Sequence, residues 1–387
     1  MKALYLDYAA TTPCAPEVAD LMAGCLTIDG NFANPASRSH RFGWQAEQAV
    51  ETARGHVAAM IGADTREVVW TSGATESNNL AIKGYIEAVR REEPDAPVHI
   101  ITSAIEHKAV LDTVSYLQKW HSVEVTFLTP DADGLIQPQQ VGDALRPHTR
   151  LVTLMAVNNE LGTITDISAI SALLKNHGAL LHVDAAQAVG KMAVDVNNWG
   201  VDMMSLSAHK FYGPKGIGAL YVRRDPQVPL VSQIHGGGHE RGMRSGTLPT
   251  HQLVGFGEAA RLVSEQLDND EARIRSLRDR LWHGISALGD VWINGHEHQR
   301  VANHLNVSFG GVDGEILLAS LARVAVSSGS ACTSASVEPS YVLKAIGRSD
   351  ELAHAGLRMS VGRYTTEEDI DFAISEISRI LGMLRKG

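Results

Sequence analysis

Lys210 and Asp184 each stand directly after a short apolar run, and their side chains suit a charged carbonyl cofactor. Lys210 lies in the turn SLSAHKFYG, and a lysine at such a turn can form a Schiff base with a carbonyl compound. Asp184 ends the run ALLHVD, where a buried carboxylate needs a cation such as a pyridinium nitrogen. Considered separately, a solvated surface lysine and a helix N-cap aspartate are the simpler interpretations. Further segments of the chain favour a shared cofactor site over these simpler interpretations.

Two further segments supply an anion site and an aromatic base. Residues 68–84 predict a strand, a small-residue turn and a helix. The backbone N–H groups around Gly73, Ala74 and Thr75 would suit a phosphate ester, although an ordinary strand-to-helix turn has a similar sequence. His107 follows another apolar run; a lone histidine is more often structural, but here an imidazole could stack on a flat ring and exchange protons. Because ligands of open α/β sheets gather at the carboxyl ends of strands, these segments together predict one shared site.

Cys332 is the candidate nucleophile. It lies in the segment SSGSACTSASVEPSYVLKAIG, which has no large apolar residue from Ser327 to Ser336. Structural cysteines normally sit among hydrophobic residues, so we expect Cys332 on a mobile, exposed loop where a thiolate can act. Cys14 and Cys25 lack such a context and are interpreted as packing residues.

The elements that must position these residues predict an α/β fold. Short apolar runs alternate with helical stretches, and the spacing between runs leaves room for strand–helix–strand crossovers. The runs show little polar alternation, which indicates strands covered by helices on both faces of a mostly parallel sheet. The predicted strands are 98–102, 151–157, 179–183, 201–206 and 218–222.

The last third of the chain has a different pattern. Residues 251–266 and 272–288 predict two amphipathic helices, and short strands are expected near 304–309 and 322–327. A final helix is expected to begin at Thr365, with Glu368 at capping-box spacing.

Two domains are therefore expected. Residues 16–263 would form the large α/β domain that binds the cofactor. Residues 1–15 and 264–387 would form a smaller α+β domain, which carries the cysteine loop at about 327–340.

Composition narrows the class of protein. The chain has 34 Lys and Arg against 44 Asp and Glu, so its net charge of −10 argues against direct nucleic-acid binding. No segment has the length of apolar sequence that a membrane span needs. The three cysteines lack a paired spacing, which favours a reducing compartment and a cytoplasmic enzyme.

Taken together, the motifs resemble those of group I cysteine desulfurases of the IscS/NifS type, which are fold-type I pyridoxal phosphate (PLP) enzymes related to class V aminotransferases. The resemblance covers nearly the whole chain. It implies a large domain with a mostly parallel seven-stranded sheet, and a homodimer. The motifs that carry it are YLDYAATTP (5–13), NPAS (34–37), TSGATESNN (71–79), EHKAV (106–110), VNNELG (157–162), VDAAQ (183–187), SAHKFYGPKGIG (207–218), RSGTL (244–248), SSGSACTSA (327–335) and LRMSVGR (357–363).

The resemblance also implies roles for individual residues. Lys210 would hold PLP covalently, Asp184 would pair with its pyridinium and Gln187 would contact its ring hydroxyl. His107 would stack on the ring and shuttle protons, and Cys332 would attack the substrate sulfur.

Phosphate and substrate contacts follow from the same resemblance. The further cofactor residues would be Ala74, Thr75, Asn158, Ser207 and His209, with Thr247 reaching in from the partner subunit. The substrate residues would be Asn34, Asn158 and Arg358.

The implied reaction takes sulfur from L-cysteine and leaves L-alanine and a persulfide on Cys332, which is passed to an acceptor protein. The acceptor would be an iron–sulfur scaffold or an enzyme of tRNA thiolation or DNA phosphorothioation. Family members that serve the general scaffold usually carry a tail beyond the last helix, whereas this sequence ends at LRKG, so a dedicated acceptor is also expected.

Other interpretations remain open at this stage. A transaminase or a selenocysteine lyase would use the same scaffold, but a transaminase has no need of Cys332. A non-catalytic binding module would not need a Schiff-base lysine. A metal site is the weakest interpretation, because HGGGH (235–239) and HEH (296–298) lack completing ligands, although transient ligation of a cluster by Cys332 stays open.

Overall fold

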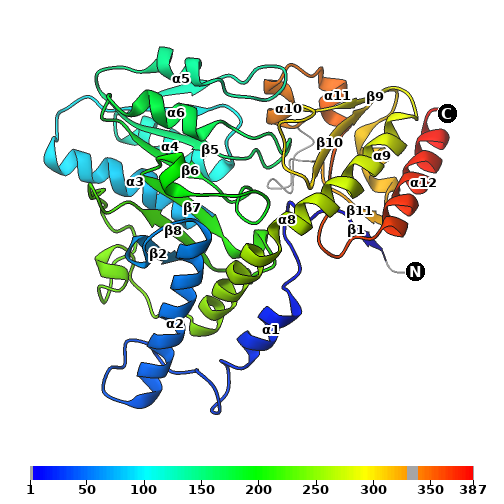
Figure 1. Ribbon diagram of the computed structural model, residues 1–387. Coiled ribbons are helices and arrows are strands. Elements are labelled where there is room, and N and C mark those ends of the chain that lie inside the picture. Colours follow the sequence, from blue (N-terminus) through cyan, green and yellow to red (C-terminus); the bar gives the residue numbers. More distant parts are fainter. Residues whose placement is uncertain (1–2, 329–338, 387) are drawn as a thin grey trace.

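A seven-stranded sheet lies at the centre of the larger part of the molecule (Figure 1). The computed structural model describes residues 3–328 and 339–386 of the chain. β8 is antiparallel to both of its neighbours, and every other pair is parallel, as expected from the sequence. In spatial order the strands are β2 (Val68–Thr71), β8 (Gly218–Val222), β7 (Met203–Ser207), β6 (Leu180–Asp184), β5 (Thr149–Met155), β3 (His99–Ser103) and β4 (Glu124–Leu128).

Helices cover both faces of this sheet, which explains the unbroken apolar runs. Successive residues of one strand belong to different cores: Ile100 packs with one set of helices, and Ile101 packs with the other. The first face is covered by α3 (Ala74–Glu92) and α4 (Lys108–Trp120). The second is covered by α2 (Arg41–Met60), α6 (Ile167–Leu174) and the first half of α8 (Thr250–Ser286). Shorter helices are α1 (Pro16–Ala23), α5 (Pro138–Ala144) and α7 (Val196–Trp199).

The prediction of two helices between residues 251 and 288 was wrong, because α8 is one helix of 37 residues. The stretch 268–271 between the two predicted helices is polar, but it contains no glycine or proline to end a helix. Its residue Asp270 instead bonds Arg363 of the smaller part. Leu253 and Phe256 of α8 pack in the core of the larger part, and Leu277 and Leu281 pack in a second core.

That second core belongs to a smaller α+β unit at the right of Figure 1. The N-terminal strand β1 pairs in parallel with β11, and Leu6 is buried in the same core. The elements are β1 (Leu4–Tyr5), β11 (Val324–Ala325), a sheet of β12 (Gly356–Ser360), β10 (His304–Phe309) and β9 (Val291–Ile293), and the helices α9 (Gly314–Ser320), α10 (Tyr341–Ala345), α11 (Asp350–His354) and α12 (Glu367–Leu384). The two cores support a proposed boundary within α8, near residue 263.

The final helix begins one residue later than expected. Thr366 caps α12 and forms the capping box with Asp369, where Thr365 and Glu368 had been predicted. Thr365 faces inward instead, and its hydroxyl accepts the N–H of Gly362. Among the described residues, no helix is long and apolar enough to cross a membrane.

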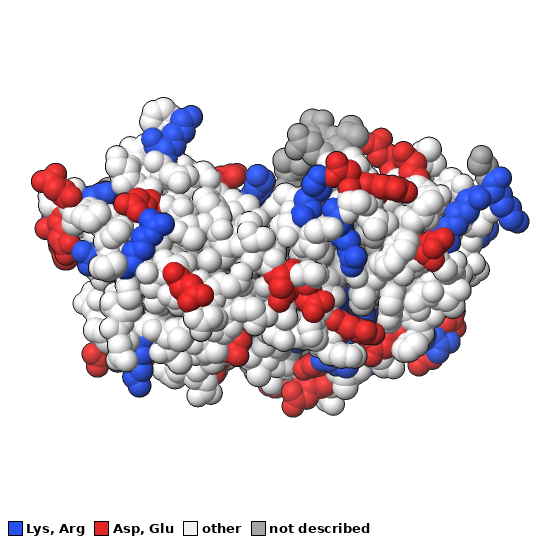
Figure 2. Space-filling view, turned by 90° about the horizontal axis from the view of Figure 1, so that it is seen from above, with Lys and Arg blue, Asp and Glu red and all other residues white. Residues whose placement is uncertain are grey.

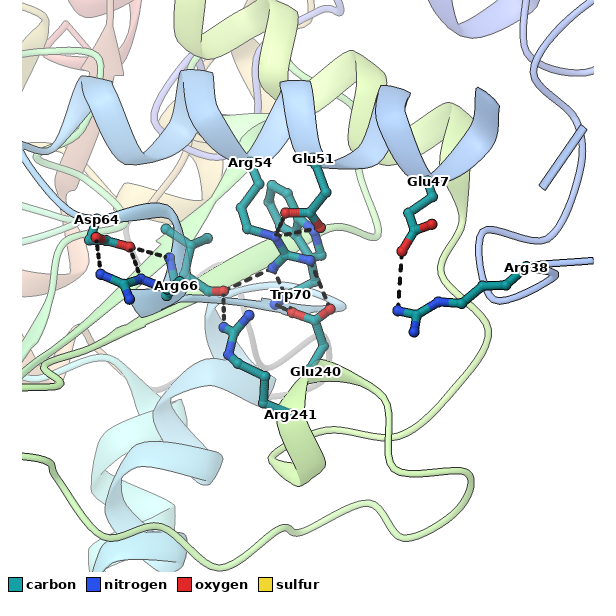
Figure 3. A network of polar contacts seen from close by, with 10 residues as sticks. Arg38, Glu47, Glu51, Arg54, Asp64, Arg66, Trp70, Glu240 and Arg241 are labelled. Carbon is teal, nitrogen blue, oxygen red and sulfur yellow. Dashed lines mark hydrogen bonds and ion pairs between the residues drawn. The ribbon is translucent and has the colours of Figure 1, made fainter. Parts of the chain in front are cut away.

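A buried ion pair joins α2 to the segment that follows the sheet (Figure 3). Arg54 and Glu240 are 3% and 7% exposed, and two hydrogen bonds of 2.8 and 3.0 Å link their side chains. Arg54 also donates to the carbonyl of Val68, and the carboxylate of Glu240 accepts the N–H of Trp70. The pair therefore anchors the segment before Thr247 against the edge strand β2.

We expect Arg54→Met to lower the free energy of unfolding by about 3–5 kcal/mol, because it leaves the buried carboxylate of Glu240 without its cation. Denaturant unfolding followed by tryptophan fluorescence measures the loss. Adding Glu240→Gln should recover part of it, since the uncompensated charge is then gone.

The control is Arg38→Met, in the exposed pair Arg38–Glu47 of the same figure. An exposed pair contributes about 0–1 kcal/mol, so this variant should unfold almost as the unsubstituted chain does. Equal losses for Arg38→Met and Arg54→Met would contradict the assignment of Arg54–Glu240 as a structural anchor.

Candidate functional site

A cleft of about 610 Å³ opens at the carboxyl ends of the central strands. It collects residues from the ends of β2, β3, β5, β6 and β7, and from the N-terminal segment and β12. The sequence-predicted residues that line it are Ala74, Thr75, His107, Asp184, Gln187, Ser207, His209, Lys210 and Arg358. The chain topology thus brings most of the predicted site together.

Lys210 and Asp184 come from neighbouring parallel strands. Lys210 lies in a single turn after β7, and its Nζ donates to the carbonyl oxygens of Ala9 and Ala10 at 2.9 Å each. Asp184 is the last residue of β6 and is 6% exposed. Its carboxylate accepts hydrogen bonds from Asn78 Nδ2 at 2.8 Å and from the N–H of Ala186 at 3.0 Å. A buried carboxylate held by neutral donors is suited to a cationic ligand group.

His107 caps the start of α4, which fixes how its ring is used. Its Nδ1 accepts the N–H of Ala109 at 3.1 Å. Since Nδ1 serves as an acceptor, the proton of the neutral ring sits on Nε2. His107 also lines the cleft, so the residue that caps this helix is at the same time part of the site.

The opposite end of the cleft suits an anion. The helix α3 begins at Ala74, and the first-turn N–H groups of a helix have no partner within the helix. Gly73 has a φ of 150°, which a side chain would strain, and a Cβ placed there would come within 3.9 Å of Ser207 Oγ. These features form a cradle of small residues and N–H donors for a phosphate.

His209 adds a neutral donor beside this cradle. Burial, and then the neighbouring Lys210 and Lys215, lower its pKa to about 4. The ring is therefore uncharged near neutral pH, and its Nδ1 bonds the hydroxyl of Thr11 at 3.1 Å. A neutral imidazole can bind a phosphate oxygen without adding a second titration near pH 7.

The structure places Asn158 and Asn159 differently from the sequence expectation. Asn158 is 2% exposed and does not line the cleft; its Oδ1 accepts the N–H groups of Glu160 and Leu161, and its Nδ2 donates to the carbonyl of Ile105. Asn159 lines the cleft, and its buried Oδ1 has no partner among the described residues. In the VNNELG motif it is therefore Asn159, and not the expected Asn158, that the structure places at the cleft.

Arg358 reaches the cleft from β12 of the smaller unit. It is 3% exposed, and it donates to Asp7 at 2.7 Å and to the carbonyl of Asn159 at 2.9 Å. Its Nε is buried without a partner among the described residues. A guanidinium held in this way retains N–H groups for a carboxylate in the cleft.

Two further predicted residues, Asn34 and Thr247, do not line the cleft of their own chain. Asn34 is exposed, and its side chain accepts the N–H of Ala36. Thr247 is also exposed and does not line the cleft of its own chain. Cys332 lies outside the described residues.

Two buried acids, Glu106 and Glu160, are sequence neighbours of the cleft residues His107 and Asn159. Burial raises the pKa of Glu106 to about 8 and that of Glu160 to about 7. Ser103 donates to Glu106, and Ser340 donates to Glu160. Neither acid was predicted from the sequence, and nor was Asn78, which holds Asp184. Glu106, Glu160 and Asn78 all lie inside the quoted motifs, but only tertiary contacts reveal their roles.

The residues present fit PLP. The cleft offers a carboxylate for a ring nitrogen at Asp184, a lysine for a carbonyl at Lys210, and a cradle for a phosphate at Gly73–Thr75. Unpartnered buried atoms of Asn159 and Arg358 mark where a further polar ligand is accommodated. Among the described residues, no group of three or more His, Cys, Asp or Glu side chains could hold a metal ion.

On the face of the molecule in Figure 2, basic and acidic side chains are interspersed.

Comparisons with known proteins agree with this geometry. The model of the aminotransferase class-V family matches residues 4–372. The cysteine desulfurase IscS of Tolumonas auensis is 58% identical over 99% of this chain and 93% of its own length, and that of Azotobacter vinelandii is 58% identical over 99% and 94%.

Solved structures give the same result. A NifS-like protein superposes with a TM-score of 0.90 at 34% identity, covering 99% of this chain and 100% of its own. A structure described as SspA in complex with cysteine superposes with a TM-score of 0.81 at 42% identity, covering 94% and 100%. By sequence, fold and cleft, the chain belongs to the aminotransferase class-V family and, within it, to the PLP-dependent cysteine desulfurases.

Proposed function

We propose that the chain transfers sulfur from L-cysteine to Cys332, with L-alanine as the other product, and then passes the sulfur to an acceptor protein. The observation that carries the proposal is the convergence of Lys210, Asp184 and His107 on one cleft, with Arg358 at its rim. When bound, PLP supplies an electron sink that weakens the bonds at the substrate's α-carbon. The carbon–sulfur bond of the substrate and the S–H bond of Cys332 break, while a sulfur–sulfur bond forms at Cys332 and a carbon–hydrogen bond forms at the β-carbon of alanine, so no oxidant is needed.

Five residues of the cleft are proposed to act in this reaction. Arg358 binds the substrate carboxylate, and Asn159 contacts the same end of the substrate. Asp184 keeps the ring nitrogen protonated, and Lys210 holds the cofactor and moves the α-proton. His107 carries its proton on Nε2 and exchanges it with the reacting sulfur.

The thiol of Cys332 must be deprotonated to attack sulfur. An unperturbed thiol has a pKa of about 8.5, so only a few per cent is ionised at pH 7. The described residues on both sides of the cysteine segment support its access to the site. Ser327 pairs with the backbone of Arg358, and the hydroxyl of Tyr341 donates to the carbonyl of Glu106, next to His107.

A homodimer completes the proposed site. Asn34 and Thr247 lie outside their own cleft, and the segments that carry them are neighbours, since Thr250 contacts the carbonyl of Ala33. Large apolar side chains of the same region are exposed, which favours a second copy of the chain as their cover. They are Leu21, Leu26, Ile28, Phe32, Phe42 and Trp44.

The acceptor is proposed as an iron–sulfur scaffold or a thiolation enzyme, because the chain resembles IscS and also superposes on SspA. A cytoplasmic location is part of the same proposal. It is supported by three cysteines without paired spacing.

We expect Cys332→Ala to abolish sulfide release and alanine formation from L-cysteine while PLP still binds with its yellow absorption. The reason is that the acceptor of sulfur is lost but the cofactor cleft is unchanged. Cys14→Ala is the matched control and should keep full activity, since Cys14 does not line the cleft. Sulfide release at the full rate from Cys332→Ala would contradict the proposed transfer of sulfur to Cys332.

Asn159→Ala and Asn158→Ala should have different effects. Loss of a hydrogen bond to a charged substrate group weakens binding by about 1.5–3 kcal/mol, so Asn159→Ala should raise KM for cysteine roughly tenfold or more without loss of stability. Asn158→Ala should lower the midpoint of thermal unfolding, because it removes the acceptor of two buried N–H groups. Steady-state kinetics and thermal unfolding of both variants test this, and the reverse pattern would restore the sequence expectation.

We expect the double variant Phe42→Asp/Trp44→Asp to dissociate the dimer and weaken PLP binding, because two charges then lie in the proposed interface. Analytical ultracentrifugation and cofactor titration measure both effects. Trp120→Asp, which replaces another exposed tryptophan far along the chain, should leave the dimer intact. A monomeric unsubstituted protein with full activity would contradict the proposed interface.

A further inference from the structure

Lys191 is a lysine that the proposed reaction does not use, yet it lies beside the cleft. Together with Lys210 and Tyr212 it lines a small cavity of about 30 Å³. Asp270 and Glu271 border the same cavity, but among the described residues neither forms an ion pair with Lys191. A lysine in such a place needs an explanation other than a salt bridge.

The hydrogen bond of Lys191 leads to a cofactor residue. Its Nζ donates to Oε1 of Gln187, and Nε2 of Gln187 donates to the carbonyl of Ala9 at 2.9 Å. Gln187 is 4% exposed and lines the cleft. A carbonyl oxygen only accepts, so the carbonyl of Ala9 requires Nε2 on its side and leaves Oε1 facing the N–H groups of Lys191.

One hydrogen of the Gln187 amide remains to be accounted for. The Nε2 group carries two hydrogens, and the carbonyl of Ala9 takes one of them. We propose that Lys191 is a positioning residue, which holds the amide of Gln187 so that its second N–H is presented to the ring oxygen of PLP. This inference rests on the proposed contact between Gln187 and the cofactor.

Lys191 is needed because Oε1 of Gln187 is buried. Without a donor, a buried carbonyl oxygen loses its hydrogen bond and the amide turns toward another donor. Lys210 also lines the cleft and donates to the carbonyl of Ala9, which Gln187 shares. A bonded Oε1 also polarises the amide, which strengthens the N–H donor on its other side.

The orientation does not depend on the charge of Lys191. Burial, and then the positive charges of Lys210 and Arg358, hold the pKa of Lys191 well below its usual range. The ammonium and the neutral amine both carry N–H groups, so both can donate to Gln187. A methionine at this position keeps the unbranched stem but removes the donor.

The test compares Lys191→Met with Lys191→Arg in the purified protein reconstituted with PLP. A donor to the ring oxygen sets the balance between the protonated and ionised forms of bound PLP, and hence its absorption spectrum. We expect Lys191→Met to change this spectrum and to raise the PLP dissociation constant roughly tenfold, on the order of one hydrogen bond. Lys191→Arg keeps a donor and should restore the spectrum. Lys175→Met, at an exposed lysine, should change neither quantity.

A second pair of variants separates this inference from the role of Gln187. Gln187→Met alone should change the spectrum, and adding Lys191→Met to it should change nothing further, because Lys191 acts through the amide. An equal further change in the double variant would overturn the inference, since Lys191 would then act on Lys210 or on PLP directly.

The experiment distinguishes a wrong role for Gln187 from a wrong role for Lys191. If Gln187→Met leaves the spectrum of bound PLP unchanged, the proposed contact of Gln187 is wrong, and the role of Lys191 falls with it. If only Lys191→Met leaves the spectrum unchanged, Gln187 keeps its role and the inference about Lys191 alone is overturned. Thermal unfolding of each variant identifies any change that comes from misfolding.

Discussion

The carboxylate of Asp184 is the constraint on which the site depends. It is almost completely buried, and its partners are the amide of Asn78 and a backbone N–H, both neutral. Among the described residues, no lysine or arginine forms an ion pair with it. Burying a carboxylate without a cation is costly, so Asp184 favours a cationic ligand group beside it. We propose that this group is the pyridinium nitrogen of PLP.

The sheet explains why the other groups reach the same ring. β6 and β7 are parallel neighbours, so Asp184 and the turn that carries Lys210 emerge at one edge. β3 runs in the same direction and delivers His107 through the cap of α4. β2 runs antiparallel to β8 and delivers the phosphate cradle at the start of α3. Four strand ends that are far apart in the sequence thus bring four different functional groups to one cleft.

Much of this arrangement was predictable, and the errors have physical causes. Apolar runs predicted the central sheet, because hydrophobic periodicity can be recognised within a short stretch of sequence. The residues at the ends of those runs predicted that Lys210, Asp184 and His107 lie at one edge of the sheet. The sequence pointed to Asn158, whereas the structure places Asn159 at the cleft, because adjacent residues of a turn point in different directions and the sequence motif does not show which one faces a ligand. The single helix α8 was missed because its polar middle bonds the smaller unit at Arg363 instead of forming a loop. The burial of Glu106 depends on tertiary packing that no spacing reveals, although its hydrogen-bond partner Ser103 is only three residues away in the sequence.

The N-terminal segment shows why the smaller unit and the cleft cannot be separated. β1 is part of the smaller unit, yet the residues that follow it form one wall of the cleft. Asp7 holds Arg358, and the carbonyl oxygens of Ala9 and Ala10 hold Lys210. Two backbone carbonyl oxygens accept from Lys210 and so fix the direction of its Nζ. The same segment therefore aligns both the proposed substrate guanidinium, through an ion pair, and the lysine proposed to hold the cofactor, through backbone carbonyl oxygens.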